Sequence, residues 1–594
     1  MTTQKNHPAA GQPDSFDRYP SYYGSDLELT YTPQRSVFTL WAPTADKVRL
    51  NLYASGEGGE PEERLEMRPS DDGTWRVAAE RDLKGTFYTF QIEKEGKWLD
   101  ETPGIWAKAV GVNGDRAAVI DLRETDPEGW EADRAPELKM YSDIILYELH
   151  HRDFSVAPDS GIENKGKFLA LTETGTKTPQ GEASGLDHLK ELGVTHIHIL
   201  PSFDYATVDE ARLNDKTYNW GYDPKNYNVP EGSYSTDPAD PAARIREFKQ
   251  MVQSLHRNGM RIVLDVVYNH TSPDSVLYRE HPEYFYRGPD GKPGNKLGDW
   301  ADVIDLDYSN RGLWQYLTDT LVMWAGLVDG FRCDVASFVP VEFWLQARAA
   351  VSAVNPDCVW LAETVHRSYG CLARRHGVYS ASDGEVFRAF DLEYEYDVRE
   401  VFDRYLRGEV PLSRYLDALN FQETCYPANY NKLRFLENHD QPRICSYVKD
   451  EAALQNYTAM LYFLKGTTLL YAGQEFENDH LPSLFEKEPI DRASGKDLTP
   501  LLKKLAGIKR LLGTQDYFRA EANDEQNIAV MQRAGAAGRF VGVFSLQAKS
   551  AGVCVPAADG TYENLLDGSA VTVKAGCIHC DGAPVIFRAP EREG

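Results

Sequence analysis

Hydrophobic and polar positions alternate in several short runs within the first 130 or so residues. The alternation has a period of two, and turn-forming residues separate the runs, which is typical of β-strands with one buried face. We predict strands at residues 36–43, 47–53, 74–78 and 86–92, and no amphipathic helix before about residue 130. So many short strands predict a β-sandwich over residues 26–130. The polar residues 1–25 are expected to form a mobile leader.

From residue 143 the pattern changes, because short apolar runs now alternate with longer amphipathic stretches. The predicted strands are residues 144–149, 195–200, 261–267, 328–333, 358–362, 387–390, 433–436 and 467–471. The predicted helices are residues 186–192, closed by Gly193, and 242–256, 312–327, 341–354 and 451–464. Eight strands that alternate with helices predict an α/β fold, a (β/α)8 barrel over residues 143–512.

Two segments interrupt this repeat. Residues 201–240 and 272–309 are long and rich in Gly, Pro and Tyr, so we expect rim insertions after the second and third strands. After the barrel, residues 527–531, 539–544 and 583–587 form short strand-like runs. They predict a C-terminal β-sandwich over residues 515–594, which makes three domains in all.

Composition narrows the set of partners. The net charge of -27 argues against nucleic acid or an anionic membrane, since both would repel such a surface. No run of about 18 apolar residues is present, and the N-terminus has no signal-like apolar segment, so we expect a cytoplasmic protein. The eight cysteines are scattered, as expected for free thiols. Cys577-Ile578-His579-Cys580 lacks a second pair of ligands nearby, which argues against a metal site there.

Polar and ionisable residues follow four of the predicted strands. The third strand contains Asp265 and runs on to Asn269 and His270, and Arg332 and Asp334 close the fourth. Glu363 follows the fifth strand, and Asn438, His439 and Asp440 follow the seventh. Because barrel enzymes place their chemistry at the carboxyl ends of the strands, these side chains are expected to meet at one rim. A single such residue would more often be a structural cap or ion pair, but four groups favour a functional site.

Three carboxylates at one rim suit the cleavage of a glycosidic bond. One carboxylate attacks the anomeric carbon, a second protonates the leaving oxygen, and a third can hold the substrate. Arg332 and Asp334 are two residues apart on a strand and therefore point to the same face. The positive charge of Arg332 would favour the ionised form of Asp334, and histidines at the rim could donate hydrogen bonds to sugar hydroxyls.

Four short segments resemble, in order, the four signature regions of the α-amylase superfamily, glycoside hydrolase family 13. They are Asp265-Val266-Val267-Tyr268-Asn269-His270, Gly330-Phe331-Arg332-Cys333-Asp334, Ala362-Glu363 and Asn438-His439-Asp440. The resemblance covers residues 143–512. It implies that Asp334 is the nucleophile, Glu363 the general acid and base, and Asp440 a transition-state-stabilising carboxylate. It also implies that Arg332, His270, His439 and Asp265 line the subsite of the attacked glucose.

Further motifs concern the subfamily. Phe38-Thr39-Leu40-Trp41-Ala42-Pro43-Thr44-Ala45 resembles the carbohydrate-binding sandwich that precedes the barrel in pullulanases and in glycogen branching and debranching enzymes. Tyr147-Glu148-Leu149-His150 and the segment 218–224 resemble pullulanases, which cleave α-1,6 branches, and Tyr222 would then stack on the attacked sugar. In contrast, Asn438-His439-Asp440-Gln441-Pro442-Arg443 looks more like enzymes that act on α-1,4 bonds.

The sequence therefore predicts a retaining hydrolase of α-glucans that acts by double displacement on α-1,4 bonds, α-1,6 bonds or both. The alternatives are an α-glucan transglycosylase of the branching type and, less favoured because all three carboxylates are present, a non-catalytic glucan-binding protein. No cofactor is expected for catalysis. The resemblance allows a structural calcium ion near Asn269, although no set of six to eight oxygen ligands can be identified in residues 272–309.

Overall fold

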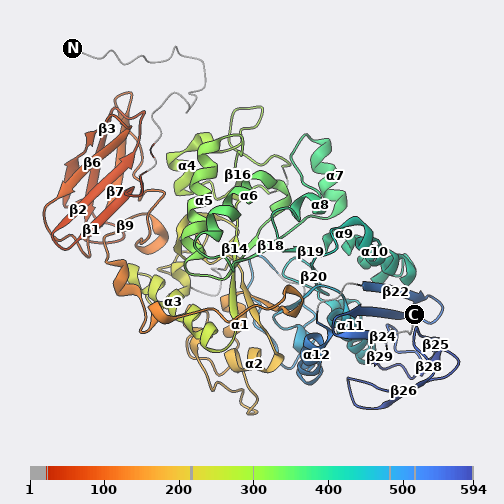
Figure 1. The fold of residues 1–594 in the computed structure, drawn as a ribbon. Helices are drawn as coiled ribbons and strands as arrows, with labels where there is room; N and C mark the ends of the chain where they lie inside the picture. The colour runs from red at the N-terminus through yellow and green to blue at the C-terminus, as the bar shows by residue number, and fades with distance from the viewer. Residues whose placement is uncertain are drawn as a thin grey trace.

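The computed structural model describes residues 22, 24–213, 218–298, 300–480, 483–513 and 517–590. Nearly all of the predicted leader, residues 1–25, lies outside the described residues. Figure 1 shows three parts, with the N-terminal sheets and the C-terminal sheets on opposite sides of a central barrel. This arrangement confirms the predicted fold class, although the predicted domain boundaries stay predictions.

The central part is a closed barrel of eight parallel strands. In order around the barrel the strands are β10 (Ile145–Leu149), β11 (His196–Ile199), β14 (Arg261–Val266), β17 (Gly330–Cys333), β18 (Val359–Ala362), β19 (Leu392–Tyr394), β20 (Lys432–Arg434) and β21 (Thr467–Tyr471). Every residue of these strands is buried. Burial on both faces explains the apolar run of β18, whereas β11 (His-Ile-His-Ile) and β20 (Lys-Leu-Arg) carry buried polar side chains.

Helices connect the strands and cover the outside of the barrel. They are α1 (His151–Ser155), α2 (Gly185–Leu192), α3 (Pro241–Arg257), α4 (Val276–Glu280), α5 (Arg311–Ala325), α6 (Val341–Ser352), α7 (Arg367–Arg375), α8 (Asp383–Val386), α9 (Tyr396–Leu406), α10 (Leu412–Cys425), α11 (Glu451–Phe463) and α12 (Thr499–Leu512). Their ends follow local chemistry: Asp240 caps α3 with Pro241 in its first turn, and Gly193 ends α2 at a φ of 77°. No helix in the described part of the chain is long and apolar enough to cross a membrane.

The predicted sixth strand is wrong. Residues 387–390 form the turn after α8, and the strand begins later, as β19. The apolar signal came from Phe390, which packs against Trp344 and Trp360 on the helix side of the barrel. A short apolar run has the same appearance in a strand and in a buried turn, so the pattern placed the strand too early.

In their described residues, the two predicted insertions extend the barrel rim. The first carries a short hairpin of β12 (Phe203–Tyr205) and β13 (Pro224–Pro230). The second contains α4 and pairs β15 (His270–Thr271) with β16 (Ile304–Asp305). The two insertions follow β11 and β14, so they lie next to the carboxyl ends of these strands.

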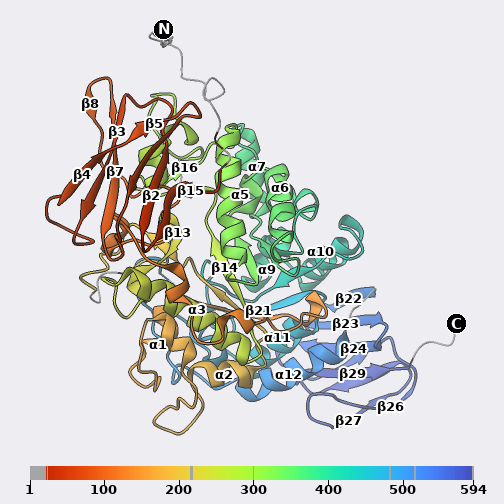
Figure 2. The ribbon, with the colours of Figure 1, turned by 60° about the vertical axis from the view of Figure 1, so that its left-hand side comes forward.

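The flanking parts consist of antiparallel sheets, as predicted. The N-terminal part has one sheet of β1 (Glu28–Thr32), β2 (Arg35–Trp41), β6 (Thr74–Ala79) and β5 (Arg68–Pro69), and a second of β4 (Glu63–Glu66), β3 (Lys47–Tyr53), β7 (Phe87–Lys94), β8 (Lys97–Trp98) and β9 (Ala117–Ala118). The C-terminal part has a main sheet of β22 (Tyr517–Asn523), β23 (Ile528–Gly535), β24 (Gly538–Ser545) and β29 (Val585–Ala589), with two hairpins of β25 (Ala551–Cys554) and β28 (Cys577–Cys580), and of β26 (Gly560–Glu563) and β27 (Ala570–Val573). Figure 2 shows β22 next to the barrel helix α10.

Candidate active site

The fourth strand, β17, presents the central pair of the site. Arg332 is fully buried, and its Nη1 atom lies 2.8 Å from Oδ1 of Asp334 and 3.0 Å from Oδ1 of Asp265. The other oxygen of Asp334, Oδ2, is buried and has no hydrogen-bond partner among the described residues. One oxygen of Asp334 is thus fixed by a cation, while the second is available to a substrate.

Glu363 lies on the other side of the same guanidinium group. Its Oε1 atom is 2.8 Å from Nη2 of Arg332, and its Oε2 atom accepts a hydrogen bond of 2.8 Å from the backbone N–H of Val335. Val335 has a φ of 42°, a region that β-branched residues rarely adopt. The strained backbone just after Asp334 therefore points the N–H group of Val335 towards Glu363. Arg332 and this N–H group together fix the position of the Glu363 carboxyl group next to Asp334.

Burial raises the pKa values of the two carboxyl groups by different amounts. It raises the pKa of Asp334 to about 6, partly offset by the charge of Arg332. It raises the pKa of Glu363 to about 8, again against the charge of Arg332 and with a further rise from Asp334. Between these values Asp334 is ionised and Glu363 is protonated. A pair with one charged and one neutral carboxyl group is the state required by a nucleophile and a general acid.

Asp440 enters the site from the loop after β20. Its side chain is 41% exposed, and Oδ2 lies 3.2 Å from Nε2 of His439. Among the ion pairs of the described residues, none joins Asp440 to Arg443, the nearby cation that follows it in the same loop. Arg443 instead donates to Glu437 at 2.8 Å and to the carbonyl of Ala472 at 3.0 Å. Asp440 is therefore an exposed carboxylate at the rim, with His439 as its cationic neighbour.

The remaining predicted residues surround this centre at different depths. Asp265 is fully buried and accepts from Arg332 and, at 2.8 Å, from the hydroxyl of Tyr222. The ring of Tyr222 stacks on that of His439 with centroids 5.6 Å apart. His270 uses Nε2 to contact the backbone carbonyl of Tyr222 at 2.9 Å. All eight residues proposed for catalysis or sugar binding thus belong to one site, with Asp265 and Arg332 forming its floor.

Part of that floor was not predicted from the sequence. Glu148 on β10, His198 on β11 and Tyr394 on β19 are fully buried on the inner face of the barrel. His198 places Nδ1 3.2 Å from Glu148 and Nε2 3.2 Å from Asp265. The available signal was an ionisable residue inside an apolar run, because inside a barrel such a residue must be paired.

Asn269 does not have the surroundings of a calcium site. Its side-chain amide faces the ring of His270 at 3.4 Å, and its backbone carbonyl accepts from Leu306. The ammonium group of Lys296 bonds to the carbonyl of Leu306 at 2.8 Å, so a positive charge already lies close by. Calcium requires six to eight oxygen ligands with carboxylates among them. The described residues around Asn269 do not fit that requirement.

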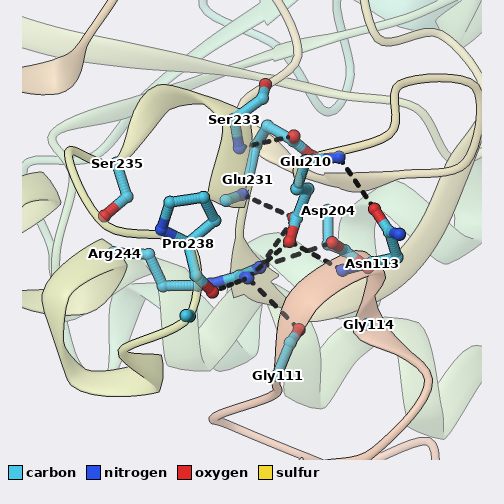
Figure 3. Close-up of polar contacts among 12 residues, drawn as sticks. Gly111, Asn113, Gly114, Asp204, Glu210, Glu231, Ser233, Ser235, Pro238 and Arg244 are labelled. Atoms are coloured by element: carbon cyan, nitrogen blue, oxygen red, sulfur yellow. Dashed lines mark hydrogen bonds and ion pairs between the residues drawn. The ribbon is translucent and has the colours of Figure 1, made fainter. Parts of the chain in front are cut away.

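A different acidic cluster occurs where the N-terminal part meets the first rim insertion. Asp204, Glu210 and Glu231 form the one group of potential metal ligands within the described chain, and all three are buried. Figure 3 shows that the guanidinium group of Arg244 lies among them. Arg244 contacts the two oxygens of Glu210 at 3.0 and 2.7 Å and lies 3.5 Å from Asp204.

Arg244 therefore supplies the positive charge that a metal ion would otherwise provide. The cluster also joins two parts of the protein, because Arg244 donates to the carbonyl of Gly111 and Glu210 accepts from the backbone of Asn113 at 2.7 Å. Burial raises the pKa of Glu231 to about 8 and that of Asp204 to about 7, with further rises from neighbouring carboxylates. These features describe a buried ion pair at a domain contact, not a metal site.

Cysteines form no metal group in the described residues either. All eight are free thiols. Cys577, from the motif at residues 577–580, lies opposite Cys554 in the antiparallel pair of β25 and β28. The Sγ atoms of Cys554 and Cys577 lie 2.7 Å apart.

Comparison with known proteins matches each of the three parts. The model of the alpha amylase catalytic domain matches residues 166–302 and 298–528, which together exceed half of the chain. Carbohydrate-binding module 48, described as the isoamylase N-terminal domain, matches residues 26–105. The bacterial alpha amylase C-terminal domain matches residues 519–587.

Individual relatives include pullulanases. The pullulanase of Bacillus subtilis (strain 168) is 38% identical over 350 residues, which cover 58% of this chain and 47% of that protein. The chain thus spans about half or less of the length of such curated relatives.

Solved structures cover more of the chain. A pullulanase from Paenibacillus barengoltzii in complex with maltohexaose and alpha-cyclodextrin has a TM-score of 0.84 and 30% identity, with 97% of both chains covered. An alpha-amylase from Lactobacillus plantarum has a TM-score of 0.66 and 36% identity, covering 75% of this chain and 99% of that one. The family match over the barrel, together with the site at its rim, shows that this chain belongs to the α-amylase superfamily, glycoside hydrolase family 13.

Proposed function

We propose that the protein is a retaining glycoside hydrolase that cleaves α-glucans. The observation that carries this proposal is the Arg332 guanidinium group, which contacts both Asp334 and Glu363 at 2.8 Å while the two carboxyl groups differ in their pKa values. Asp334 acts as the nucleophile and Glu363 as the general acid. The family match and the relatives named pullulanase support the same substrate class.

In the first step Glu363 gives its proton to the glycosidic oxygen while a carboxylate oxygen of Asp334 attacks the anomeric carbon. The carbon–oxygen bond to the leaving sugar breaks, and a covalent bond between glucosyl and Asp334 forms. In the second step Glu363, now ionised, removes a proton from water, and the water oxygen displaces Asp334. Two inversions at the anomeric carbon give net retention of configuration.

Other residues shape the subsite for the attacked sugar. Tyr222 presents an aromatic ring held by Asp265 and His439, a surface suited to a sugar face. Asp440, exposed at the rim, is placed to accept hydrogen bonds from sugar hydroxyls as positive charge develops on the ring. The net negative charge of the protein is compatible with such a substrate because α-glucans are neutral.

For the linkage we propose α-1,6 bonds, since the pullulanase from Paenibacillus barengoltzii matches 97% of this chain. A second candidate is the α-1,4 bond. It is supported by the identity of 36% with the alpha-amylase from Lactobacillus plantarum and by the segment Asn438-His439-Asp440-Gln441-Pro442-Arg443. Both bonds can use the same pair of carboxyl groups, because linkage depends on how the leaving sugar is held.

Digestion of pullulan, in which maltotriose units are joined by α-1,6 bonds, distinguishes the two. Cleavage of α-1,6 bonds releases maltotriose, whereas cleavage of α-1,4 bonds releases trisaccharides that retain an α-1,6 bond. Linear maltodextrin and a branched limit dextrin serve as companion substrates. Lack of hydrolysis of all three would contradict the proposed function. Products formed in ¹⁸O-labelled water test transglycosylation, because a transferase would build new glucan bonds without incorporating label.

The pH dependence of kcat/KM should be bell-shaped. Because Asp334 must be ionised, activity should rise as the pH passes about 6, and because Glu363 must be protonated, activity should fall as the pH passes about 8. Initial rates at low substrate concentration across the range check this result. Activity that is already lost as the pH rises towards about 6, where Asp334 should become ionised, would contradict the assignment.

Removal of divalent metal ions should leave activity unchanged. The proposed chemistry uses only side chains, and Arg244 provides the positive charge in the acidic cluster. The measurement is the initial rate on a soluble α-glucan after treatment with a chelator, with the thermal midpoint followed in parallel. Immediate loss of activity at an unchanged thermal midpoint, restored by calcium, would contradict this prediction.

A further inference from the structure

One carboxylate beneath the proposed active site is the start of two chains of polar contacts. Glu148 is fully buried on the inner face of β10. Its Oε1 atom accepts from the backbone N–H of His439 at 2.8 Å and lies 3.0 Å from Nδ1 of the same residue. Its Oε2 atom lies 3.2 Å from Nδ1 of His198 and accepts from the hydroxyl of Tyr394 at 3.2 Å. Both histidines therefore turn Nδ1 towards one carboxylate.

The far side of each histidine meets a second carboxylate. Nε2 of His198 lies 3.2 Å from Asp265, and Nε2 of His439 lies 3.2 Å from Asp440 and 2.8 Å from the hydroxyl of Tyr222. A neutral imidazole carries one N–H group and can donate on one side only, whereas an imidazolium ion donates on both sides. A histidine between two carboxylates is thus arranged to carry a positive charge.

The register of the barrel makes this arrangement specific. Glu148 lies directly opposite His198 in the pairing of β10 with β11, and opposite Tyr471 in the pairing with β21. On the neighbouring pair of strands, Asp265 lies opposite Arg332. His198 lies opposite Val263, two residues before Asp265, so the contacts step along the barrel interior from Glu148 and His198 to Asp265 and the arginine that holds Asp334.

We propose that Glu148 is a positioning residue that keeps His198 and His439 as imidazolium ions and so orients Asp265 and Asp440 around the attacked sugar. This inference rests on the proposed function, because it concerns the same site. Glu148 has no exposed surface through which it could contact a sugar. It acts through the two histidines.

The charge balance of the site supports this role. Burial by itself lowers the pKa of His439, but the charges of Asp440 and Glu148 outweigh it and raise the pKa to about 9. Burial by itself also lowers the pKa of His198, but the hydrogen bond to Asp265 and the negative charges of Asp265 and Glu148 outweigh it and raise the pKa. The ionisable groups that face Glu148 from the surrounding elements are His198 from β11, Tyr394 from β19, Tyr471 from β21 and His439 from the loop after β20.

A purely structural role for Glu148 is the alternative, and the chain offers a matched control for it. Glu475 is also buried, lies 3.1 Å from Nε2 of His188 and accepts from the hydroxyl of Tyr147 at 2.8 Å. Tyr147 precedes Glu148 on β10 and points to the opposite, helix-facing side of the strand. Glu475→Gln therefore removes the same charge from a His–Glu–Tyr group outside the barrel interior.

The experiment compares Glu148→Gln, Glu148→Asp and Glu475→Gln. In Glu148→Gln we expect kcat to fall about 10- to 100-fold, the scale found when a group that orients a histidine is removed. KM should change little, and the alkaline limit of activity should move to lower pH, because His439 loses its proton more easily. Glu148→Asp keeps the charge and should restore most of this pH profile. Glu475→Gln should leave the profile in place.

Histidine titration followed by NMR gives a second readout that does not depend on activity. The signal of His439, assigned by its loss in His439→Asn, should titrate at lower pH in Glu148→Gln than in the wild type and Glu475→Gln. The inference would be overturned if the His439 signal titrated at the same pH in Glu148→Gln as in the wild type. It would also be overturned if Glu475→Gln lost as much kcat as Glu148→Gln and neither variant changed the pH profile of activity. If the wild type cleaves no α-glucan, the proposed function fails, and the titration alone decides the role of Glu148. Should Glu148→Gln not fold, the wild-type titration decides, because a His439 signal that titrates no higher than an unperturbed histidine overturns the inference.

Discussion

Replacing Asp334 with alanine should lower kcat on an α-glucan by about 10⁴-fold or more, the scale of losing a nucleophile in other hydrolases. Asp334 is the one carboxylate of the site with an oxygen fixed by Arg332 at 2.8 Å and a second, buried oxygen that has no partner in the described residues. No other described side chain has this combination at the rim. Without it the bond to the anomeric carbon cannot form, and Glu363 alone does not replace it.

A small external anion should partly restore this variant. Alanine leaves space where the carboxylate was, so azide can attack the anomeric carbon of an activated α-glucoside, and the product should be a glycosyl azide of inverted configuration. The matched control is Asp329→Asn, which changes a buried carboxylate at the other end of the same strand, paired with His256 at 2.9 Å. It should keep kcat within about threefold, as expected for a site remote from the chemistry. An azide product of retained configuration, or nearly normal activity in Asp334→Ala, would contradict the double displacement.

The barrel and the rim residues were predictable for a common physical reason. Parallel strands covered on both faces must be apolar, so they stand out as runs, and side chains that cannot be buried unpaired appear where the runs end. Arg332, Asp334 and Glu363 all follow this rule. The helix ends were readable for another reason, since capping is local, as the Asp240–Pro241 start of α3 and Gly193 at the end of α2 illustrate.

Features that depend on packing between distant segments were not predictable. Residues 387–390 looked like a strand because Phe390 is buried, but it is buried against Trp344 and Trp360 on the outside of the barrel. Likewise, the surroundings of Glu148 depend on the register between β10 and β11 and on a loop almost 300 residues further along, a separation of 291 residues in the contact with His439. Periodicity carries no information on such partners.

The strain at Val335 belongs to the same class. Its positive φ is imposed by the structure around Asp334 and not by the residue itself, because a β-branched residue disfavours that conformation. A glycine at this position would have indicated a turn in the sequence, whereas a valine gives no such indication. The hydrogen bond from the N–H group of Val335 to Glu363 therefore could not be predicted from the sequence.

Asp440→Asn should lower kcat by about a hundredfold or more, the scale of losing a preorganised electrostatic partner of the transition state. Asparagine keeps the size of the side chain but removes the charge that faces the developing positive charge on the sugar. KM should change little, because the interaction strengthens in the transition state more than in the bound substrate. The measurement is kcat and KM on the same α-glucan for variant and wild type.

The thermal midpoint of Asp440→Asn distinguishes a catalytic role of Asp440 from a role in holding the loop. The Asp440 side chain is 41% exposed, and the loop is held by other contacts, notably Arg443 with Glu437 at 2.8 Å and the backbone of His439 with Glu148 at 2.8 Å. Loss of the exposed carboxylate should therefore leave the thermal midpoint nearly unchanged. Arg443→Gln is the contrasting variant, because it removes the cation paired with the buried carboxylate of Glu437 and should lower the midpoint clearly. Near-normal kcat in Asp440→Asn would remove Asp440 from the catalytic trio, whereas a lowered midpoint with raised KM would show that the carboxylate supports the loop instead.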